Sequence, residues 1–472
     1  MKIVFDFVCD EAPLFSEVGA LLAMENHQIL GFTIGNRWKD VWEDKFKTYK
    51  LTLNNELNVE RELSRIAEVY REETPASFLP ADRFLNTKSR SLQKQFLVSH
   101  FHSFEEMVEQ ENPDMIITTG VAYMYNLVIL AVCKNIGIKC VSLYGTRQPK
   151  SMFTYSTSKG GNWEYLDNIY RQELININRT DETDDYLEEQ EYLVKFRAKI
   201  RKPDYMVSAR QAGGVNFVFV KEFVTRIWHW YIDGWGGQED DYLTKHPFWY
   251  ASRDIKRIAL KKILPLFRLF DQVNLSDKYI LFPLHLQPEA STLILSKFYV
   301  NQLEVIRNIS KVLPADVSLY VKEHPAAYGR HKIGFYKRLL EIHNVKLIAP
   351  DFDTKKMILN SKGVIVLSGT MGWEAMLLGI PVYVLGNVFY DNFKNIIKVS
   401  GFQELGTKIN SSFTCDEKSI LAALRSINKA AFEGVFDVCK LDTSKRVLAY
   451  DNIVKVKQGV DRIISIDISN NY

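Results

Sequence analysis

The chain has 472 residues, of which 46% are hydrophobic and 25% are charged, with 60 basic and 57 acidic side chains. This composition excludes fibrous and intrinsically disordered classes. The near balance of charge gives no reason to expect nucleic acid as a partner. The length suits two α/β domains of about 200 residues each.

The cysteines, the first residues and the apolar runs indicate the cellular compartment of the protein. Five cysteines are scattered without a Cys-x-x-Cys pair, which favours a reducing compartment and argues against a zinc site. Asp6, Asp10 and Glu11 interrupt the first segment and argue against a secretory leader. The longest apolar run, near 127–133, is far shorter than the ~20 residues that span a bilayer. We therefore expect a cytoplasmic protein, either soluble or peripheral.

The first half alternates predicted strands and helices. A glycine turn at Gly120 follows one strand, and Gly137 ends the helix after it. Strand, helix and strand in this order form a βαβ unit, which predicts a parallel sheet. The predicted strands are 2–8, 28–34, 114–120 and 139–143, with a helix at 14–26, another ending at Asn135, and a mostly helical stretch from 39 to 102.

Two unusual segments follow. Residues 226–250 are rich in Trp and Tyr, and residues 255–270 form a basic amphipathic stretch. Such a stretch can lie on a membrane surface, or it can pack by its apolar face as a helix between domains. We favour the packed helix, because core packing is the commoner use of an apolar stripe.

The second half predicts a doubly wound sheet. Apolar residues from Leu295 to Leu313 recur at helical spacing, and other helices fall between the strands. In such sheets ligands bind at the carboxyl ends of the strands. The predicted strands are 278–284, 318–322, 345–348, 363–367 and 381–385. We expect an N-terminal domain at 1–272, a nucleotide-binding domain at 273–425, and C-terminal helices at 426–472 that pack back on the first domain.

A first polar cluster follows the strand at 278–284 and runs from His285 through Gln287 to Glu289. Ser291 or Thr292 is predicted to cap the helix that begins there. Glu289 can bind sugar hydroxyls or act as a base. The structural alternative is a carboxylate that only stabilises a helix N-terminus.

A second cluster follows the strand at 318–322 and contains Lys322, His324 and Pro325. Proline blocks further ladder pairing and turns the chain, which aims His324 toward a ligand. An imidazole there can donate to a phosphate oxygen and stabilise a departing phosphate. The Lys322 ammonium adds positive charge beside it. The structural alternative is a histidine that only closes a strand end.

The third cluster begins at Ser368, where a strand runs through Gly369 and Thr370 into a helix. Backbone N–H groups at a helix start favour an anion such as a nucleotide phosphate. Glu374, one turn into the helix, can accept hydrogen bonds from ribose hydroxyls. An ordinary capped helix is the structural alternative. The run is neither a Walker loop nor a GxGxxG fingerprint.

At these three clusters the sequence resembles the capsule polysaccharide synthesis family, which includes bacterial transferases of Kdo and related ulosonic acids. The motifs that carry the resemblance are Gln287-Pro288-Glu289, His324-Pro325 and the run from Ser368 to Pro381. They occur in this order, each beside a predicted strand, and the resemblance covers about residues 278–390.

The resemblance implies a GT-B fold, in which two Rossmann-like α/β domains face a central cleft. It implies a CMP-activated sugar acid of the Kdo, pseudaminic or sialic type as donor, and a glycan or glycolipid acceptor. No metal and no other cofactor are expected. The family works at the cytoplasmic face of the inner membrane, in capsule or lipopolysaccharide synthesis, so peripheral membrane contact is expected.

The resemblance also assigns roles to the clusters. His324 is expected to contact the CMP phosphate, and Glu289 to bind the donor or assist proton transfer. The residues expected to bind the nucleotide sugar are Gln287, Lys322, Pro325, Ser368, Gly369, Thr370 and Glu374.

The first half offers weaker candidates. The family carries an acidic catalytic residue in this half, and Asp10 and Glu11 are the candidates by position, because both follow the first strand. Arg147 follows another strand and could bind a donor carboxylate bidentately.

Three other functions stay open at this point. One is a CDP-glycerol-type polymerase, which also uses a His-Pro histidine and a cytidine nucleotide. Another is a UDP-sugar transferase or 2-epimerase of the same fold. The third, of a different class, is a non-catalytic scaffold of a capsule assembly complex, with 228–250 and 255–270 as its contact surfaces.

Overall fold

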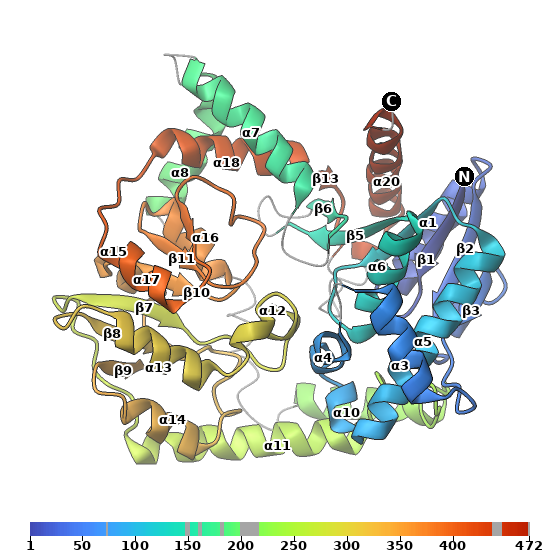
Figure 1. The fold of residues 1–472 in the computed structure, drawn as a ribbon, viewed down its shortest axis with the longest axis horizontal. Helices are drawn as coiled ribbons and strands as arrows, with labels where there is room; N and C mark the ends of the chain where they lie inside the picture. The colour runs from blue at the N-terminus through green and yellow to red at the C-terminus, as the bar shows by residue number, and fades with distance from the viewer. Residues whose placement is uncertain are drawn as a thin grey trace. The chain divides into compact units, whose positions relative to one another are not determined.

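The computed structural model describes residues 1–71, 74–146, 152–158, 163–179, 184–198, 217–436 and 446–470. The chain divides into two compact units, each with its own sheet (Figure 1). The first unit contains residues 1–166, 228–245 and 427–472, and the second contains residues 167–227 and 246–426.

The first unit is built on a sheet with the strand order β13-β6-β5-β4-β1-β2-β3. The strands from β5 to β3 are parallel, whereas β6 and β13 are antiparallel additions at one edge. The parallel part has the 3-2-1-4-5 order of a Rossmann-like fold. The strands are β1 (Lys2–Asp6), β2 (Gln28–Thr33), β3 (Lys47–Lys50), β4 (Met115–Thr119), β5 (Lys139–Gly145), β6 (Met152–Ser156) and β13 (Phe432–Glu433).

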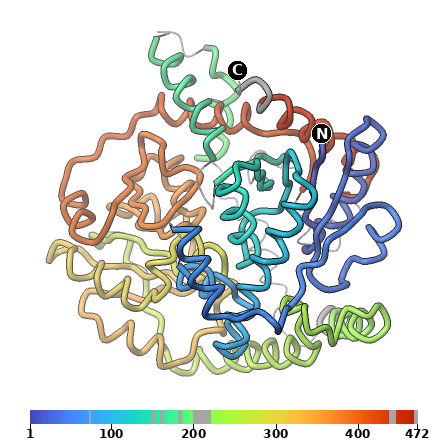
Figure 2. The backbone as a smooth tube through the Cα atoms, turned by 45° about the vertical axis from the view of Figure 1, so that its right-hand side comes forward, coloured from blue at the N-terminus to red at the C-terminus, as the bar shows by residue number. Residues whose placement is uncertain are grey.

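The core of the first unit joins the two ends of the chain. The C-terminal helix lies beside the N-terminal segment in both views (Figure 2). Its buried residues Ile453, Val456, Val460 and Ile463 recur at helical spacing and pack in the cluster that holds β1 and α1. The helices of this unit are α1 (Ala12–Ala23), α2 (Lys39–Trp42), α3 (Val59–Val69), α4 (Pro75–Phe78), α5 (Arg90–Glu111), α6 (Met124–Ile136) and α20 (Tyr450–Asn470).

The second unit is built on a fully parallel sheet with the order β12-β11-β10-β7-β8-β9. Counted from β7, this is the 3-2-1-4-5-6 order of a dinucleotide-binding sheet read from the β9 edge. The strands are nearly all apolar because both faces are covered. They are β7 (Tyr279–Pro283), β8 (Ser318–Lys322), β9 (Val345–Ile348), β10 (Val364–Val366), β11 (Val382–Val384) and β12 (Ile396–Lys398).

The helices of the second unit alternate with these strands after a helical segment that precedes the sheet. Two of them, α7 (Glu164–Arg179) and α10 (Phe217–Tyr231), run across the division between the units, and α18 ends beyond it. The others are α8 (Leu187–Ala198), α11 (Pro247–Ile263), α12 (Ala290–Leu293), α13 (Gln302–Val312), α14 (Ile333–Leu340), α15 (Thr354–Asn360), α16 (Thr370–Leu377), α17 (Phe402–Ile409) and α18 (Glu417–Ala430).

The predicted α/β class with parallel sheets is confirmed, and the strands at its centre agree with the prediction. The strands that were not predicted, β3, β6, β12 and β13, lie at or next to sheet edges. These strands are only two to five residues long, and β3 has the polar sequence Lys-Thr-Tyr-Lys, so their apolar signal is weak. The single helix predicted around 295–313 is wrong, because a 3-10 turn at Lys297–Tyr299 separates α12 from α13.

The compact units differ from the expected division at residue 272. Residues 167–227 and 246–272 group with the second unit instead. Helix α7 shows why, because the Tyr170 hydroxyl lies 2.7 Å from the Ser419 hydroxyl and Asn392 donates to Asp167 at 2.6 Å. These are contacts across more than 200 positions of sequence, which local pattern does not reveal.

Helix α11 confirms a helix in the basic segment but not its expected packing. Phe248, Ile255 and Ile263 point to one side of this helix, and their exposed fractions are 60%, 52% and 41%. Leu266, in the 3-10 turn that follows, is 79% exposed. The favoured interpretation of a buried apolar face is therefore wrong for this side of α11. Within the described residues, no helix is long and apolar enough to cross a bilayer.

Candidate functional site

The three predicted clusters lie at the carboxyl ends of the strands of the second sheet. All strands of this sheet run parallel, so β7, β8 and β10 have their carboxyl ends on the same side. Strand order reverses between β7 and β10, which makes their ends the topological switch point of the sheet. A crevice outside the strand ends at this point is where open α/β sheets bind ligands.

His285 connects the two strands at the switch point. Its Nε2 accepts a hydrogen bond from the Ser368 N–H at 3.3 Å, and the Ser368 hydroxyl donates to the Ser291 carbonyl at 2.5 Å. The Gln302 side chain holds the His285 backbone through two hydrogen bonds of 2.7 and 2.9 Å. Burial, with a smaller effect of the His324 charge, lowers the pKa of His285 to about 3. His285 is therefore neutral, and it holds the segments after β7 and β10 together. Its position in the sequence did not reveal this role.

The cluster after β7 is arranged differently from the prediction. Glu289, half-buried, is itself the N-cap residue of α12 and has an extended backbone. Ser291 and Thr292 lie inside this helix, and the Thr292 hydroxyl donates to the Glu289 carbonyl at 3.1 Å. The predicted capping by Ser291 or Thr292 is therefore wrong. The Gln287 amide donates to the Val300 carbonyl at 2.5 Å, which ties the loop to the start of α13.

The cluster after β8 presents His324 in a defined tautomer. Its Nδ1 accepts the Ala326 N–H at 3.1 Å, so in the neutral ring the proton is on Nε2. Strand β8 ends at Lys322, and the chain turns from His324 onward, where the Ala327 N–H donates to the His324 carbonyl at 2.9 Å. Lys322 is buried and its ammonium donates to the Pro350 carbonyl at 2.7 Å, so it contributes charge from beneath the surface.

Glu323, which sequence reasoning missed, supports His324 from behind. Its Oε1 accepts the His324 N–H at 2.6 Å and its Oε2 accepts the Tyr336 hydroxyl at 2.5 Å. The side chain is 1% exposed, and burial raises the pKa of Glu323 to about 7. The only sequence signal for this support was a carboxylate directly before His324, between it and Lys322.

The cluster after β10 forms a helix N-terminus. Gly369 is the N-cap residue of α16, without a side-chain cap, and Thr370 and Glu374 are half-buried in the first turns. The first N–H groups of a helix have no partner within it. A Cβ on Gly369 would lie 3.0 Å from His285 Nε2, and Tyr390 donates its hydroxyl proton to the Gly369 carbonyl. The residue type thus lets α16 start close against His285.

The candidates of the first unit lie after β1. Glu11 is half-buried at the start of α1, where it makes no side-chain cap, and Asp10 is exposed and paired with Arg37. Asp6, at the end of β1, is fully buried. Arg147 lies outside the described residues.

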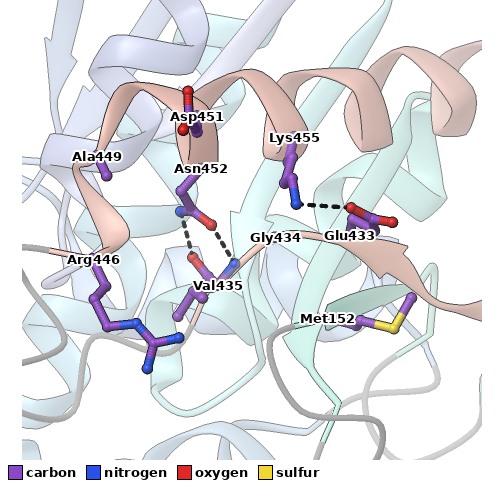
Figure 3. Close-up of a pocket in the computed structure, with 9 residues that line it drawn as sticks. All are labelled: Met152, Glu433, Gly434, Val435, Arg446, Ala449, Asp451, Asn452 and Lys455. Carbon is purple, nitrogen blue, oxygen red and sulfur yellow. Dashed lines mark hydrogen bonds and ion pairs between the residues drawn. The ribbon is translucent and has the colours of Figure 1, made fainter.

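One pocket of the first unit is lined by neither Asp10 nor Glu11. It is open, encloses about 500 Å³, and lies between β13 and α20 (Figure 3). Asn452 fixes its floor through hydrogen bonds to the backbone of Val435 at 2.6 and 3.0 Å, and Lys455 pairs with Glu433 at 3.0 Å. These polar groups are thus bound to one another. Across the part of the chain that the structure describes, no group of three His, Cys, Asp or Glu side chains is placed to hold a metal ion.

Comparison with known proteins finds matches in capsule synthesis. Residues 260–393 match the family described as capsule polysaccharide biosynthesis protein. Among curated relatives, the chain is 24% identical over 158 residues to the capsule polysaccharide export protein KpsS of Escherichia coli. It is 32% identical over 72 residues to the capsule polysaccharide modification protein LipA of Neisseria meningitidis. The aligned segments cover 30% and 15% of this chain, and only 37% and 10% of these relatives.

Solved structures that resemble this chain include two of KpsC from Thermosulfurimonas dismutans. The β-Kdo 2,7 transferase aligns over 78% of this chain and 88% of its own, with 13% identity and a TM-score of 0.32. The β-Kdo 2,4 transferase aligns over 66% of this chain and 80% of its own, with 12% identity and a TM-score of 0.34. The family match, in contrast, falls on the segment that carries all three polar clusters.

Proposed function

We propose that this chain, a member of the capsule polysaccharide biosynthesis family by its residues 260–393, is a glycosyltransferase of capsule assembly that takes a sugar acid from a CMP-activated donor. The donor's nucleotide binds at the switch point of the second sheet. The acceptor is the hydroxyl of a glycan or glycolipid. The observation that carries the proposal is His324, held beside this switch point with a defined tautomer.

The start of α16 is suited to the CMP phosphate. The uncapped N–H groups after Gly369 provide fixed donors and the positive end of the helix dipole. The Thr370 hydroxyl adds a donor, and Glu374 accepts from ribose hydroxyls one turn further along. Ser368 has a positioning role, because its N–H and hydroxyl already bind His285 and Ser291.

His324 acts on the leaving group. Its Nε2–H donates to an oxygen of the CMP phosphate, on which negative charge grows as the bond to the anomeric carbon breaks. The Ala326 N–H and the Glu323 carboxyl group hold the ring and the backbone of His324 in place before the substrate arrives. Lys322 contributes a buried positive charge, while Gln287 and Pro325 shape the loops on either side. With these groups to meet the phosphate charge, we expect turnover to persist when divalent metals are chelated.

The transfer itself needs a base for the acceptor. The acceptor oxygen bonds to the anomeric carbon, the bond to the CMP phosphate breaks, and CMP leaves with the bonding electron pair. The hydroxyl proton passes to a carboxylate, for which we propose Glu11 at the start of α1. Glu289 binds hydroxyls of the donor sugar.

Replacement of His324 tests this function. His324→Ala should lower turnover at least about 100-fold, the usual effect of losing one oxyanion donor, with an unchanged melting temperature because the side chain is only half-buried. The matched control is His343→Ala, an exposed histidine of the same unit, which should keep full turnover. Full turnover in His324→Ala would remove the leaving-group role.

We also propose that α11 lies on the cytoplasmic face of the inner membrane. Its exposed Phe248, Ile255 and Ile263 are accompanied by Lys256 and Lys262, both exposed. An apolar stripe flanked by lysines is suited to an anionic lipid surface. Co-sedimentation with anionic vesicles tests the contact, and a protein that stays in the supernatant at low salt would contradict it.

A further inference from the structure

Four cationic side chains gather where α11 contacts the loop that follows His324. Three belong to the side of α11 opposite its exposed apolar stripe, and the fourth belongs to the loop. We call this group the cation cluster; it consists of Arg253, Arg257, Lys261 and Arg330.

The backbone holds the cation cluster together. Arg257 Nε donates to the Tyr328 carbonyl at 3.4 Å. The next residue, Gly329, has a φ of +82°, and a Cβ there would lie 2.7 Å from Lys261 Cγ and 2.8 Å from the Arg257 carbonyl oxygen. Glycine therefore permits both the backbone conformation and the close approach of the loop to α11. The packing of this loop against α11 therefore brings the cations together.

These cations repel one another. Burial lowers the pKa of Lys261, and the charges of Arg257 and Arg330 lower it further. Desolvation likewise lowers the pKa of Arg330, with further contributions from Arg257 and Arg253, while Asp254 and Glu289 oppose the shift. Asp254 is already bound to Arg253 at 3.0 Å. The cluster therefore carries an excess of positive charge in a partly desolvated place.

One donor of the cluster lacks a partner. Arg257 Nη2 is buried, and within the described residues it has no hydrogen-bond acceptor. A buried guanidinium nitrogen without an acceptor is costly, and an arriving oxyanion would satisfy it. Guanidinium groups bind carboxylates and phosphates through paired hydrogen bonds.

We propose that the cation cluster is a binding site for an oxyanion group of a substrate. This rests on the proposed function, and the oxyanion is either the carboxylate of the donor sugar acid or a phosphate of the acceptor glycolipid. The location supports the assignment, because Arg330 lies six residues after His324 in the same compact turn, and Glu289 acts on it electrostatically. An anion held here would orient its substrate beside the leaving group.

Binding of inorganic phosphate tests the site without any turnover. The melting temperature of the wild-type protein should rise with millimolar phosphate beyond the rise seen with chloride at equal ionic strength. Arg330→Gln, a change at a surface side chain, should weaken phosphate binding about ten-fold, and adding Arg257→Gln should abolish the specific shift. No specific shift in the wild type, or an unchanged shift in the double variant, would overturn the proposal.

A matched control lies on the same helix. Lys256→Gln with Lys262→Gln removes the same number of charges from the exposed side of α11 and should leave the phosphate shift unchanged. An equal loss in this control would show that only the net charge of the protein matters, and would also overturn the site.

Steady-state kinetics then separates the two sources of the oxyanion. If the donor carboxylate binds here, Arg330→Gln should raise KM for the CMP-activated sugar acid about ten-fold and leave KM for the acceptor unchanged. If an acceptor phosphate binds here, Arg330→Gln should raise KM for the acceptor about ten-fold and leave KM for the donor unchanged. A variant that alters neither KM would contradict a substrate site. A protein that shows the phosphate shift without any transferase activity would refute the proposed function while retaining the anion site.

Discussion

The switch points of the two sheets are built alike but differ at the helix that follows. In the first unit, Asp6 at the end of β1 accepts the Thr118 hydroxyl of β4 at 2.7 Å. In the second unit, His285 after β7 accepts the Ser368 N–H after β10 at 3.3 Å. Each sheet thus uses one buried polar side chain to join the two strands at which its order reverses.

The helices that start beside these bridges are capped differently. At α6 the Asn126 side chain accepts the N–H groups of Ala122 and Tyr123, and the Asp82 carboxylate accepts the Met124 N–H at 3.1 Å. At α16 no side chain caps the helix. A protein carboxylate therefore occupies the anion position in the first unit, whereas in the second unit that position can accept a phosphate. This contrast favours nucleotide binding at the second unit.

The first unit should instead contribute the base. Glu11→Gln should lower turnover about 100-fold or more, the usual contribution of a general base, while nucleotide affinity stays unchanged. Asp10→Asn is the matched control, because its carboxylate is exposed and paired with Arg37, and turnover should change by no more than a few-fold. Turnover assays of the two variants decide between them, and the reverse order of effects would place the base at Asp10.

The two buried carboxyl groups should show the smaller effects, on stability. Burial raises the pKa of Asp6 to about 6 and that of Glu323 to about 7, both above their unfolded values. Each carboxyl group therefore tends to bind a proton on folding, so its contribution to stability is most favourable below about pH 4 and falls as the pH rises to 7. Each ionised group should cost about 3 kcal/mol above pH 7.

Neutral replacements test this linkage. Asp6→Asn and Glu323→Gln should each gain stability relative to the wild type as the pH of denaturant unfolding is raised from 4 to 8. Glu323→Gln should also lower turnover several-fold, because Glu323 holds the His324 backbone, whereas Asp6→Asn should not. If the difference in unfolding free energy between a variant and the wild type does not change with pH, the pKa of the replaced group is not raised by folding.

The sequence was informative where function depends on local order. Apolar strands followed by short polar runs were sufficient to place His324, Glu289 and Ser368 on one edge of a parallel sheet. It did not reveal contacts between distant segments. The His285–Ser368 bridge spans 83 positions, and the assignment of α7 to the second unit depends on Asn392 and Ser419. The burial of Glu323 was hidden because its hydroxyl partner Tyr336 belongs to another element.

The most direct test of the account is a calorimetric titration of CMP, CDP, UDP and GDP into the wild type and two variants. Gly369→Asp would place a carboxylate at the start of α16, as Asp82 does at α6, and Gly369→Asn is its neutral control of nearly equal size. We predict that the wild type binds CMP at least about ten-fold more tightly than UDP or GDP, and that Gly369→Asp loses most of this affinity while Gly369→Asn keeps more of it. Tighter binding of CDP or UDP than of CMP would instead favour a CDP-glycerol or UDP-sugar enzyme. Absence of any nucleotide binding to the wild type would contradict the central claim and favour a scaffold.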